Sequence, residues 1–135
     1  MSILDEINAN KRLETEKARK KIRLSEFRNF PLFNRAANSL KGALREPGAG
    51  GIIAEFKLKS PSKGILHPNA DVTAVTSGYV AAGVSGLSVL TDHTYFGGSA
   101  GHLEKARLAN PLTPILRKDF ILDPWQVYES KAFGA

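Results

Sequence analysis

Residues 51–64 read GIIAEFKLKSPSKG, and the fold of the chain is decided in this stretch. Its apolar start is typical of a buried strand, which we expect over residues 51–56. Side chains two positions apart on a strand share a face, so Glu55 and Lys57 lie together where this strand ends. A carboxylate beside an ammonium is a candidate acid/base pair, although a surface ion pair explains the same two residues. The run Ser60-Pro61-Ser62 then predicts a turn with two hydroxyls available to an anion.

The chain after this stretch repeats one unit, in which an apolar strand is followed by a loop and a helix. Two more strands are predicted at 86–91 and 114–117, and helices at 71–82, 99–108 and 123–133. The strands start about 30 residues apart, which is the length of a βαβ unit. Strands that alternate with helices in this way predict an α/β fold with a parallel sheet covered by helices.

The first 48 residues contain no such strand and are predicted to be helical. One helix begins after Ser2, its N-cap, and ends near the basic run Lys20-Lys21-Arg23. A second helix is predicted over residues 33–44, before the helix-breaking run PGAGG. The chain therefore divides into an N-terminal helical extension, residues 1–48, and three βα units, residues 49–135. The apolar stripe expected on the first helix consists of Ile3, Leu4, Ile7, Leu13, Ala18 and Ile22.

Length and composition are those of a globular protein with one domain. The 135 residues are 42% hydrophobic and 24% charged. Cysteine is absent, which excludes disulfides and thiolate metal sites, and no residues have metal-ligand spacing. No apolar run approaches the roughly 18 residues of a membrane span, and the N-terminus lacks the pattern of a signal peptide. We therefore expect a cytoplasmic protein with no metal and no membrane partner.

The net charge of +6 is concentrated at the N-terminal end. Residues 1–48 hold 11 of the 19 Lys and Arg but only 6 of the 13 Asp and Glu. A basic segment can indicate nucleic-acid binding, but no aromatic side chain is interleaved here to stack on a base. We therefore expect a solvated helix face and no nucleic-acid partner. The basic residues assigned to this face are Lys11, Arg12, Lys17, Arg19, Lys20, Lys21 and Arg23.

Polar side chains follow all three predicted strands. Reactive groups of parallel α/β proteins collect at the carboxyl ends of their strands. The first strand supplies Glu55 and Lys57, the second is followed by residues 91–99, TDHTYFGGS, and the third by Lys118-Asp119-Phe120. Two lysines and a glutamate that converge from separate strands are more than a single surface ion pair requires.

Other residues at these strand ends have simpler explanations. Gly97-Gly98-Ser99 is better explained as a loop and a helix N-cap than as a phosphate cradle. Asp119 is interpreted as an ion-pair partner of Arg117 or Lys118 rather than as a base. The pair Tyr95-Phe96 either caps the core or forms the wall of a pocket for an aromatic substrate.

Five short motifs occur along the chain in a fixed order. They are IIAEFK (52–57), SPSKG (60–64), SVLTD (88–92), ILRKDF (115–120) and DPWQVY (123–128). In this order and spacing they resemble the motifs of the indole-3-glycerol-phosphate synthase family. The pairs Tyr95-Phe96 and Gly98-Ser99 belong to the same pattern, and the similarity covers essentially the whole chain.

The resemblance implies the N-terminal portion of a (β/α)8 TIM barrel, about half of an enzyme of about 250 residues. It implies about three βα units preceded by a two-helix extension. The family is a carbon-carbon lyase of tryptophan biosynthesis. It closes the indole ring of a carboxyphenylamino-deoxyribulose phosphate, giving indole-3-glycerol phosphate, carbon dioxide and water. The chain by itself, without the remainder of the barrel, is expected to be inactive.

The resemblance also implies roles for individual residues. Lys118 matches the family's general acid for ring closure, and Glu55 and Lys57 match the pair that serves the later proton transfers. Lys57 also lies near the anions of the substrate in the family. The expected lining of the substrate site is Ser60, Pro61, Phe96 and Phe120. No metal or organic cofactor is implied.

The resemblance implies a phosphorylated small-molecule substrate. The complete enzyme is expected to be monomeric, or to be fused to or associated with other enzymes of the tryptophan pathway. Two alternatives remain open at this point. One is a fragment of a related phosphate-binding barrel isomerase, against which the Glu-x-Lys-x-x-Ser-Pro-Ser run argues. The other is a non-catalytic anion-binding or interaction module derived from the same barrel.

Overall fold

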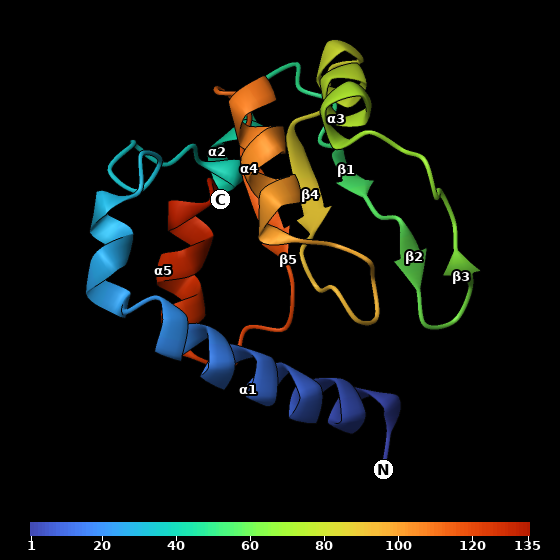
Figure 1. Ribbon diagram of the computed structural model, residues 1–135. Coiled ribbons are helices and arrows are strands. Elements are labelled where there is room, and N and C mark those ends of the chain that lie inside the picture. The colour runs from blue at the N-terminus through green and yellow to red at the C-terminus, as the bar shows by residue number, and fades with distance from the viewer.

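A parallel sheet of three strands lies at the centre of the molecule, as the computed structural model of residues 1–135 shows (Figure 1). The strands are β1 (Ile53–Phe56), β4 (Gly86–Leu90) and β5 (Ile115–Lys118), in the spatial order β1-β4-β5. Both pairings are parallel. The predicted α/β class, parallel sheet and three strands are therefore confirmed, with strand ends within two residues of those expected.

Each strand is followed by a helix: α3 (Val72–Ala81) and α4 (Ala100–Ala109) connect the strands and cover the sheet, and α5 (Pro124–Ala132) follows β5 and packs on η1. Each helix begins after a capping side chain that accepts a hydrogen bond from the first turn, namely Asp71, Ser99 and Asp123. Helices α3 and α4 pack on each other and on the sheet. The core that they enclose consists of Phe56, Val72, Leu87, Val89, Leu103, Ala106 and Ile115.

The opposite face of the sheet is not covered. Side chains alternate along a strand, so the neighbours of core residues on β1 and β5 point to this open face. Ile53 is 40% exposed and Leu116 is 43% exposed. Glu55 pairs in register with Ser88, and Ser88 with Leu116, so these three residues form one row across the open face.

A small antiparallel hairpin follows β1 and was not predicted as strands. Its strands are β2 (Lys59–Ser60) and β3 (Gly64–Ile65). The predicted turn lies between them, where the Lys63 backbone N–H donates to Ser60 Oγ at 3.2 Å. Gly64 has a positive φ of 66°, which explains why glycine closes the turn.

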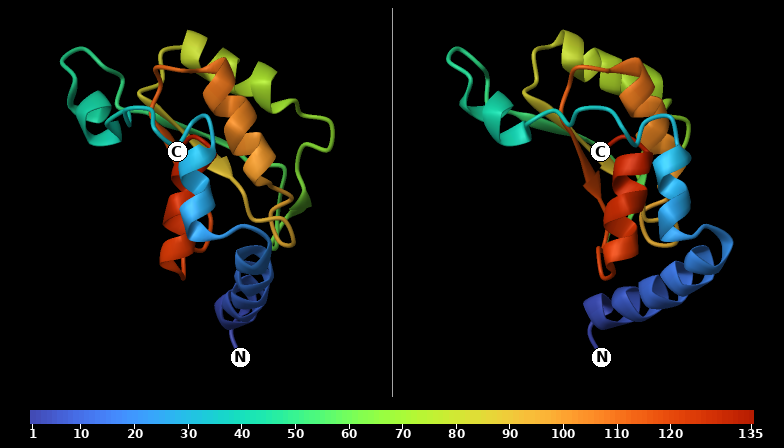
Figure 2. Two further views of the ribbon diagram at one scale, coloured as in Figure 1. Left: turned by 60° about the vertical axis from the view of Figure 1, so that its left-hand side comes forward. Right: turned by 90° about the vertical axis from the view of Figure 1, so that its left-hand side faces the viewer.

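The N-terminal residues run from one end of the sheet to the other. Helix α1 (Ile3–Lys21) crosses the end at which β4 and β5 finish, as Figure 1 shows. The 3₁₀ helix η1 (Leu24–Asn29) packs beside α5 (Figure 2). The short helix α2 (Leu40–Arg45) contacts β4, with the Leu40 side chain against the backbone of Gly86 where that strand begins. No helix combines the length and the apolar character that crossing a membrane requires.

The second predicted helix, residues 33–44, is wrong over its first half. Only Leu40–Arg45 is helical, because Ser39 acts as an N-cap and its Oγ accepts the Gly42 N–H at 2.9 Å. Phe33, placed inside the predicted helix, instead stacks on Tyr128 with ring centroids 6.2 Å apart.

The apolar stripe predicted for the first helix is confirmed only in part: Ile7 is buried, and Ala18 and Ile22 pack against the cluster that contains Phe27. The other members, Ile3, Leu4 and Leu13, are each more than 50% exposed. The buried residues of α1 are Ile7, Lys11 and Thr15, which follow one another at intervals of four and so form one stripe. Assigning Lys11 to a solvated face is contradicted as well, because this residue is 5% exposed.

Edge strands with open hydrogen-bonding groups and apolar side chains are sites of association. Both β1 and β5 pair only with β4, and Ile53 is 40% exposed. We predict that purified residues 1–135 self-associate, as measured by sedimentation velocity. Ile53→Lys should reduce the association, whereas Leu108→Lys, on the outer helix α4, should not. A compact monomer at tens of micromolar would contradict this prediction.

Candidate active site at the carboxyl ends of the strands

Glu55 is the centre of a group of charged side chains on the open face of the sheet. Its Oε2 accepts a hydrogen bond from Ser88 Oγ at 2.9 Å. Lys118 Nζ lies 3.7 Å from the same oxygen, and Lys57 Nζ lies 3.7 Å from Glu55 Oε1. The two lysines and the glutamate, which come from separate strands, therefore lie close together as predicted.

Strand register explains why these side chains meet. Glu55 and Ser88 are paired in register, and Leu90 is paired with Lys118. Lys57 and Lys118 stand two residues beyond the row that contains Glu55, so both reach back to its carboxylate from the carboxyl edge. A carboxylate between two ammonium groups can hold a proton, pass it on, or fix the positions of both cations.

The three charged groups are open to a ligand. The side chain of Lys118 is 56% exposed, that of Lys57 36% and that of Glu55 32%. At such exposure water screens the ion pairs, so they contribute little to stability. Their arrangement is therefore not explained by a contribution to stability.

A groove next to this group contains most of the residues expected to bind substrate. It has a volume of about 470 Å³ and brings together Lys57, Ser60, Pro61 and Phe96. The rings of Phe96 and Phe120 lie 6.2 Å apart and are tilted by 38°. The other lining residues are Ile3, Ile7, Ser62, Lys63 and Leu66.

Sequence reasoning missed the contribution of α1 to this groove. Ile3 and Ile7 belong to its wall, although both were assigned to a stripe that packs on the rest of the protein. Ile7 is buried, whereas Ile3 is 54% exposed beside the groove. An apolar residue in an amphipathic helix gives no signal that distinguishes a core contact from the wall of a site.

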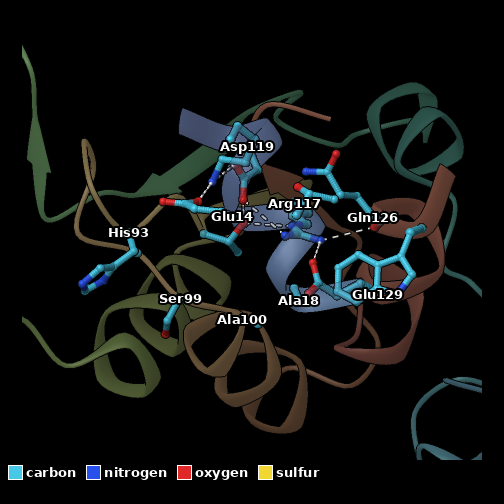
Figure 3. A pocket seen from close by; sticks show the side chains of 14 residues that line it. Glu14, Ala18, His93, Ser99, Ala100, Arg117, Asp119, Gln126 and Glu129 are labelled. Atoms are coloured by element: carbon cyan, nitrogen blue, oxygen red, sulfur yellow. Dashed lines mark hydrogen bonds and ion pairs between the residues drawn. The ribbon is translucent and has the colours of Figure 1, made fainter. Parts of the chain in front are cut away.

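A second set of charged residues lies behind the strand ends, between the sheet and α1. We call it the Lys11 cluster; its members are Lys11, Glu14, Asp92, Arg117, Asp119 and Glu129. Figure 3 shows Glu14, Arg117, Asp119 and Glu129 of this set around a shared pocket.

Two cations connect the members of the Lys11 cluster. Lys11 Nζ lies 2.6 Å from Asp92 Oδ1, 2.8 Å from Glu14 Oε2 and 3.1 Å from Asp119 Oδ1. Arg117 reaches Asp119 Oδ2 at 3.2 Å and Glu129 Oε1 at 2.6 Å. The side chains of Asp92 and Asp119 are 0% and 1% exposed, so the pairs are shielded from water.

Burial and pairing act in opposite directions on the pKa values of this cluster. Burial favours neutral Lys11, but the close contacts of its ammonium with Asp92 and Glu14 and the charge of Asp119 outweigh it and raise the pKa of Lys11. Burial likewise favours a protonated Asp119. The Thr91 hydroxyl, Lys11 and Arg117 outweigh that effect and lower the pKa of Asp119.

The structure decides between the two partners considered for Asp119. Its carboxylate pairs with Arg117 and with Lys11, and Lys118 points to the other face of β5. The predicted role of Asp119 as an ion-pair partner is confirmed, but its second cation was not foreseen. No local signal marks Lys11 as buried, because it stands among other basic residues of α1; its place on the buried stripe follows from the contacts with Asp92 and Asp119.

The diglycine loop after β4 is explained by packing. A side chain at Gly98 would collide with the backbone of Leu90 and Thr91, so the loop can turn here only with glycine. Ser99 caps α4 and accepts the His102 N–H at 3.1 Å. No cluster of three or more His, Asp or Glu side chains has the geometry to hold a metal ion.

Together, the fold and the site define the class: an α/β protein whose candidate site, a group of charged side chains, lies at the carboxyl edge of a parallel sheet. A family model for indole-3-glycerol phosphate synthase matches residues 4–135. The chain belongs to this family.

Individual relatives agree with this assignment. The indole-3-glycerol phosphate synthase of Bacteroides thetaiotaomicron is 44% identical over 135 residues, which are 98% of this chain and 50% of that protein. Those of Laribacter hongkongensis and Roseiflexus sp. are 44% and 42% identical, over 98% and 99% of this chain and 51% and 52% of the relatives. The chain thus spans about half the length of these relatives.

The lowered pKa of Asp119 makes the stability of the protein depend on pH. A carboxyl whose pKa is lower in the folded than in the unfolded chain stabilises the fold above its ordinary pKa of 3.8. This stabilisation is lost as the pH falls below that value through the folded-state pKa. We expect Asp119→Asn to lower the free energy of unfolding by about 3 kcal/mol at pH 7 and much less at pH 2–3.

The measurement is urea unfolding of the complete protein that carries this sequence, at both pH values. Glu16→Gln is the matched control, because Glu16 forms an exposed ion pair with Lys20 on α1. It should change the free energy by less than about 0.5 kcal/mol. An Asp119→Asn effect that is equal at the two pH values would show that the charge of Asp119 is not the cause.

Proposed function

We propose that this chain is the N-terminal part of an indole-3-glycerol phosphate synthase with a (β/α)8 barrel. Residues 1–48 then form the N-terminal extension, and residues 49–135 form the first three βα units of the barrel. The proposal is supported by the family match over residues 4–135, by relatives twice the length of the chain and by the parallel order β1-β4-β5. The open face of the sheet is the side that points into a closed barrel.

The reaction proposed is closure of the indole ring of a carboxyphenylamino-deoxyribulose phosphate. A bond forms between the ring carbon that carries the carboxylate and the carbonyl carbon of the sugar chain. The carboxylate leaves as carbon dioxide, and the former carbonyl oxygen leaves as water. These steps require an acid for the oxygen, a base that removes a proton from the CH2 between the nitrogen and the former carbonyl carbon as water leaves, and cations for the substrate's anions.

The observation that carries the proposal is the contact of Glu55 with both Lys57 and Lys118, at 3.7 Å each. Lys118 is the proposed general acid toward the carbonyl oxygen, because its ammonium is the most exposed of the three groups. Glu55 and Lys57 are proposed to carry the later proton transfers. Ser88, which donates to Glu55 Oε2, fixes the orientation of that carboxylate.

The groove beside these groups suits the substrate proposed. Phe96 borders the groove and Phe120 packs against Phe96, and the two tilted rings are proposed to contact the carboxyphenyl ring, since aromatic rings prefer offset or tilted contacts. Ser60 and Pro61 are proposed to line the side of the groove that Lys57 also borders, where an anionic group of the substrate would lie. A protein that only bound anions would need Lys57 but not the Lys118–Glu55 contact.

Lys118→Ala is expected to lower kcat about 10²–10⁴-fold, because it removes a positioned general acid. The measurement is the appearance of indole fluorescence in the complete protein at saturating substrate. Lys17→Ala, an exposed lysine of α1, is the control and should leave kcat unchanged. Near-normal turnover by Lys118→Ala would overturn the assignment.

Lys57→Ala should impair binding and turnover together, because this ammonium borders both the groove and Glu55. We expect KM to rise and kcat to fall, each by about tenfold or more, since charge-assisted contacts to anions are among the stronger ones. Steady-state kinetics over a range of substrate concentrations measure both. A change in kcat alone would remove the role in anion binding.

A further inference from the structure

We propose that Lys11 is a positioning residue of the active site, and that α1 acts through it to hold the ends of β4 and β5. The inference rests on the proposed function for its kinetic consequences, but its structural part is independent. Lys11 touches none of Glu55, Lys57 and Lys118; its ammonium faces the opposite side of the strand ends.

The contact with Asp92 controls the loop that presents Phe96. Asp92 is the second residue after β4, and its side chain is fully buried against the Lys11 ammonium at 2.6 Å. Its other carboxylate oxygen accepts the Tyr95 N–H at 2.9 Å, and its carbonyl accepts the Gly98 N–H at 2.7 Å. A fixed Asp92 therefore fixes the turn in which Phe96 lies.

The contact with Asp119 controls the residues on both sides of it. Asp119 Oδ1 lies 3.1 Å from Lys11 Nζ and accepts the Phe120 N–H at 2.8 Å. Its Oδ2 accepts the Thr91 hydroxyl at 2.6 Å, which ties the end of β5 to that of β4. Because Lys118 and Asp119 are consecutive and face opposite ways, fixing Asp119 also fixes the backbone from which Lys118 extends.

Three weaker contacts add to the attachment of α1 to the loop after β4. Thr94 Oγ1 donates to Glu14 at 3.0 Å, and Asn10 donates to Thr94 at 3.4 Å. Tyr95 OH donates to Glu6 at 3.3 Å. All three are exposed, whereas Lys11 is 5% exposed, so the buried ammonium is the contact that water cannot replace.

Loss of the Lys11 ammonium would take away the counter-ion of Asp92 and one of the two of Asp119, which keeps Arg117. Asp92 would move toward water or take up a proton, and the ends of β4 and β5 would lose their buried link to α1. Either response displaces Phe96, Lys118 or Phe120. A displacement of about 1 Å at a reacting centre can cost about a hundredfold in rate.

The test uses Lys11→Met in the complete protein, with Lys17→Met as control because Lys17 is exposed on the same helix. Lys11→Met should lower kcat by about a hundredfold and change KM by much less, because Lys57 and its groove remain. Lys17→Met should change neither. A Lys11→Met enzyme within twofold of the unchanged kcat would overturn the proposal.

A double variant separates positioning from simple destabilisation. Asp92→Asn in the Lys11→Met background removes one unpaired carboxylate and should restore much of the lost stability in urea. It does not restore the link to α1, so kcat should stay low. Recovery of stability and kcat together would show that Lys11 acts only through folding.

Hydrogen exchange needs no substrate, so it tests the positioning role of Lys11 independently of the proposed function. The backbone N–H groups of Tyr95 and Phe120 donate to Asp92 and Asp119. Their hydrogen exchange should become at least tenfold faster in Lys11→Met and remain unchanged in Lys17→Met. Unchanged exchange would overturn the positioning role, whereas faster exchange in a protein that never closes the ring would count against the proposed function alone.

Discussion

A charge that is buried away from water must be compensated by neighbouring opposite charges, and in this chain that requirement applies to Lys11. Its ammonium is buried among Asp92, Asp119 and Glu14 and connects α1 to the ends of two strands. Desolvation disfavours such an arrangement unless the contacts are short and complete. Here the opposing charges prevail, and they raise the pKa of Lys11. The N-terminal helix is thereby attached to the edge of the sheet that carries the candidate site.

The alternation of side chains along β5 separates two kinds of chemistry. Arg117 and Asp119 point toward the helices, where ion pairs are buried and hold elements together. Lys118 points to the open face, where it meets Glu55 and remains more than half exposed. One strand therefore supplies both the rigid support and the proposed general acid, and neither set of charges neutralises the other.

Local signals predicted most of the βα part of the fold. Apolar runs predicted the three strands, and Asp71, Ser99 and Asp123 marked the helix starts because N-caps are encoded within a few residues. The alternation within IAEFK also predicted that Glu55 and Lys57 would lie together. The failed prediction, that Lys11 is solvated, depends on contacts between residues far apart in the sequence. Lys11 is buried because the fold places Asp92 and Asp119 against it, and a lysine in a basic helix otherwise resembles a solvated one.

Under the proposed function, the carboxyl edge of this sheet belongs to a site that closes an indole ring. The most direct test supplies the carboxyphenylamino-deoxyribulose phosphate to the complete protein and follows indole fluorescence and carbon dioxide together. Both products should appear at the same rate and in equal amounts. Binding of the substrate with neither product formed would contradict the proposed function.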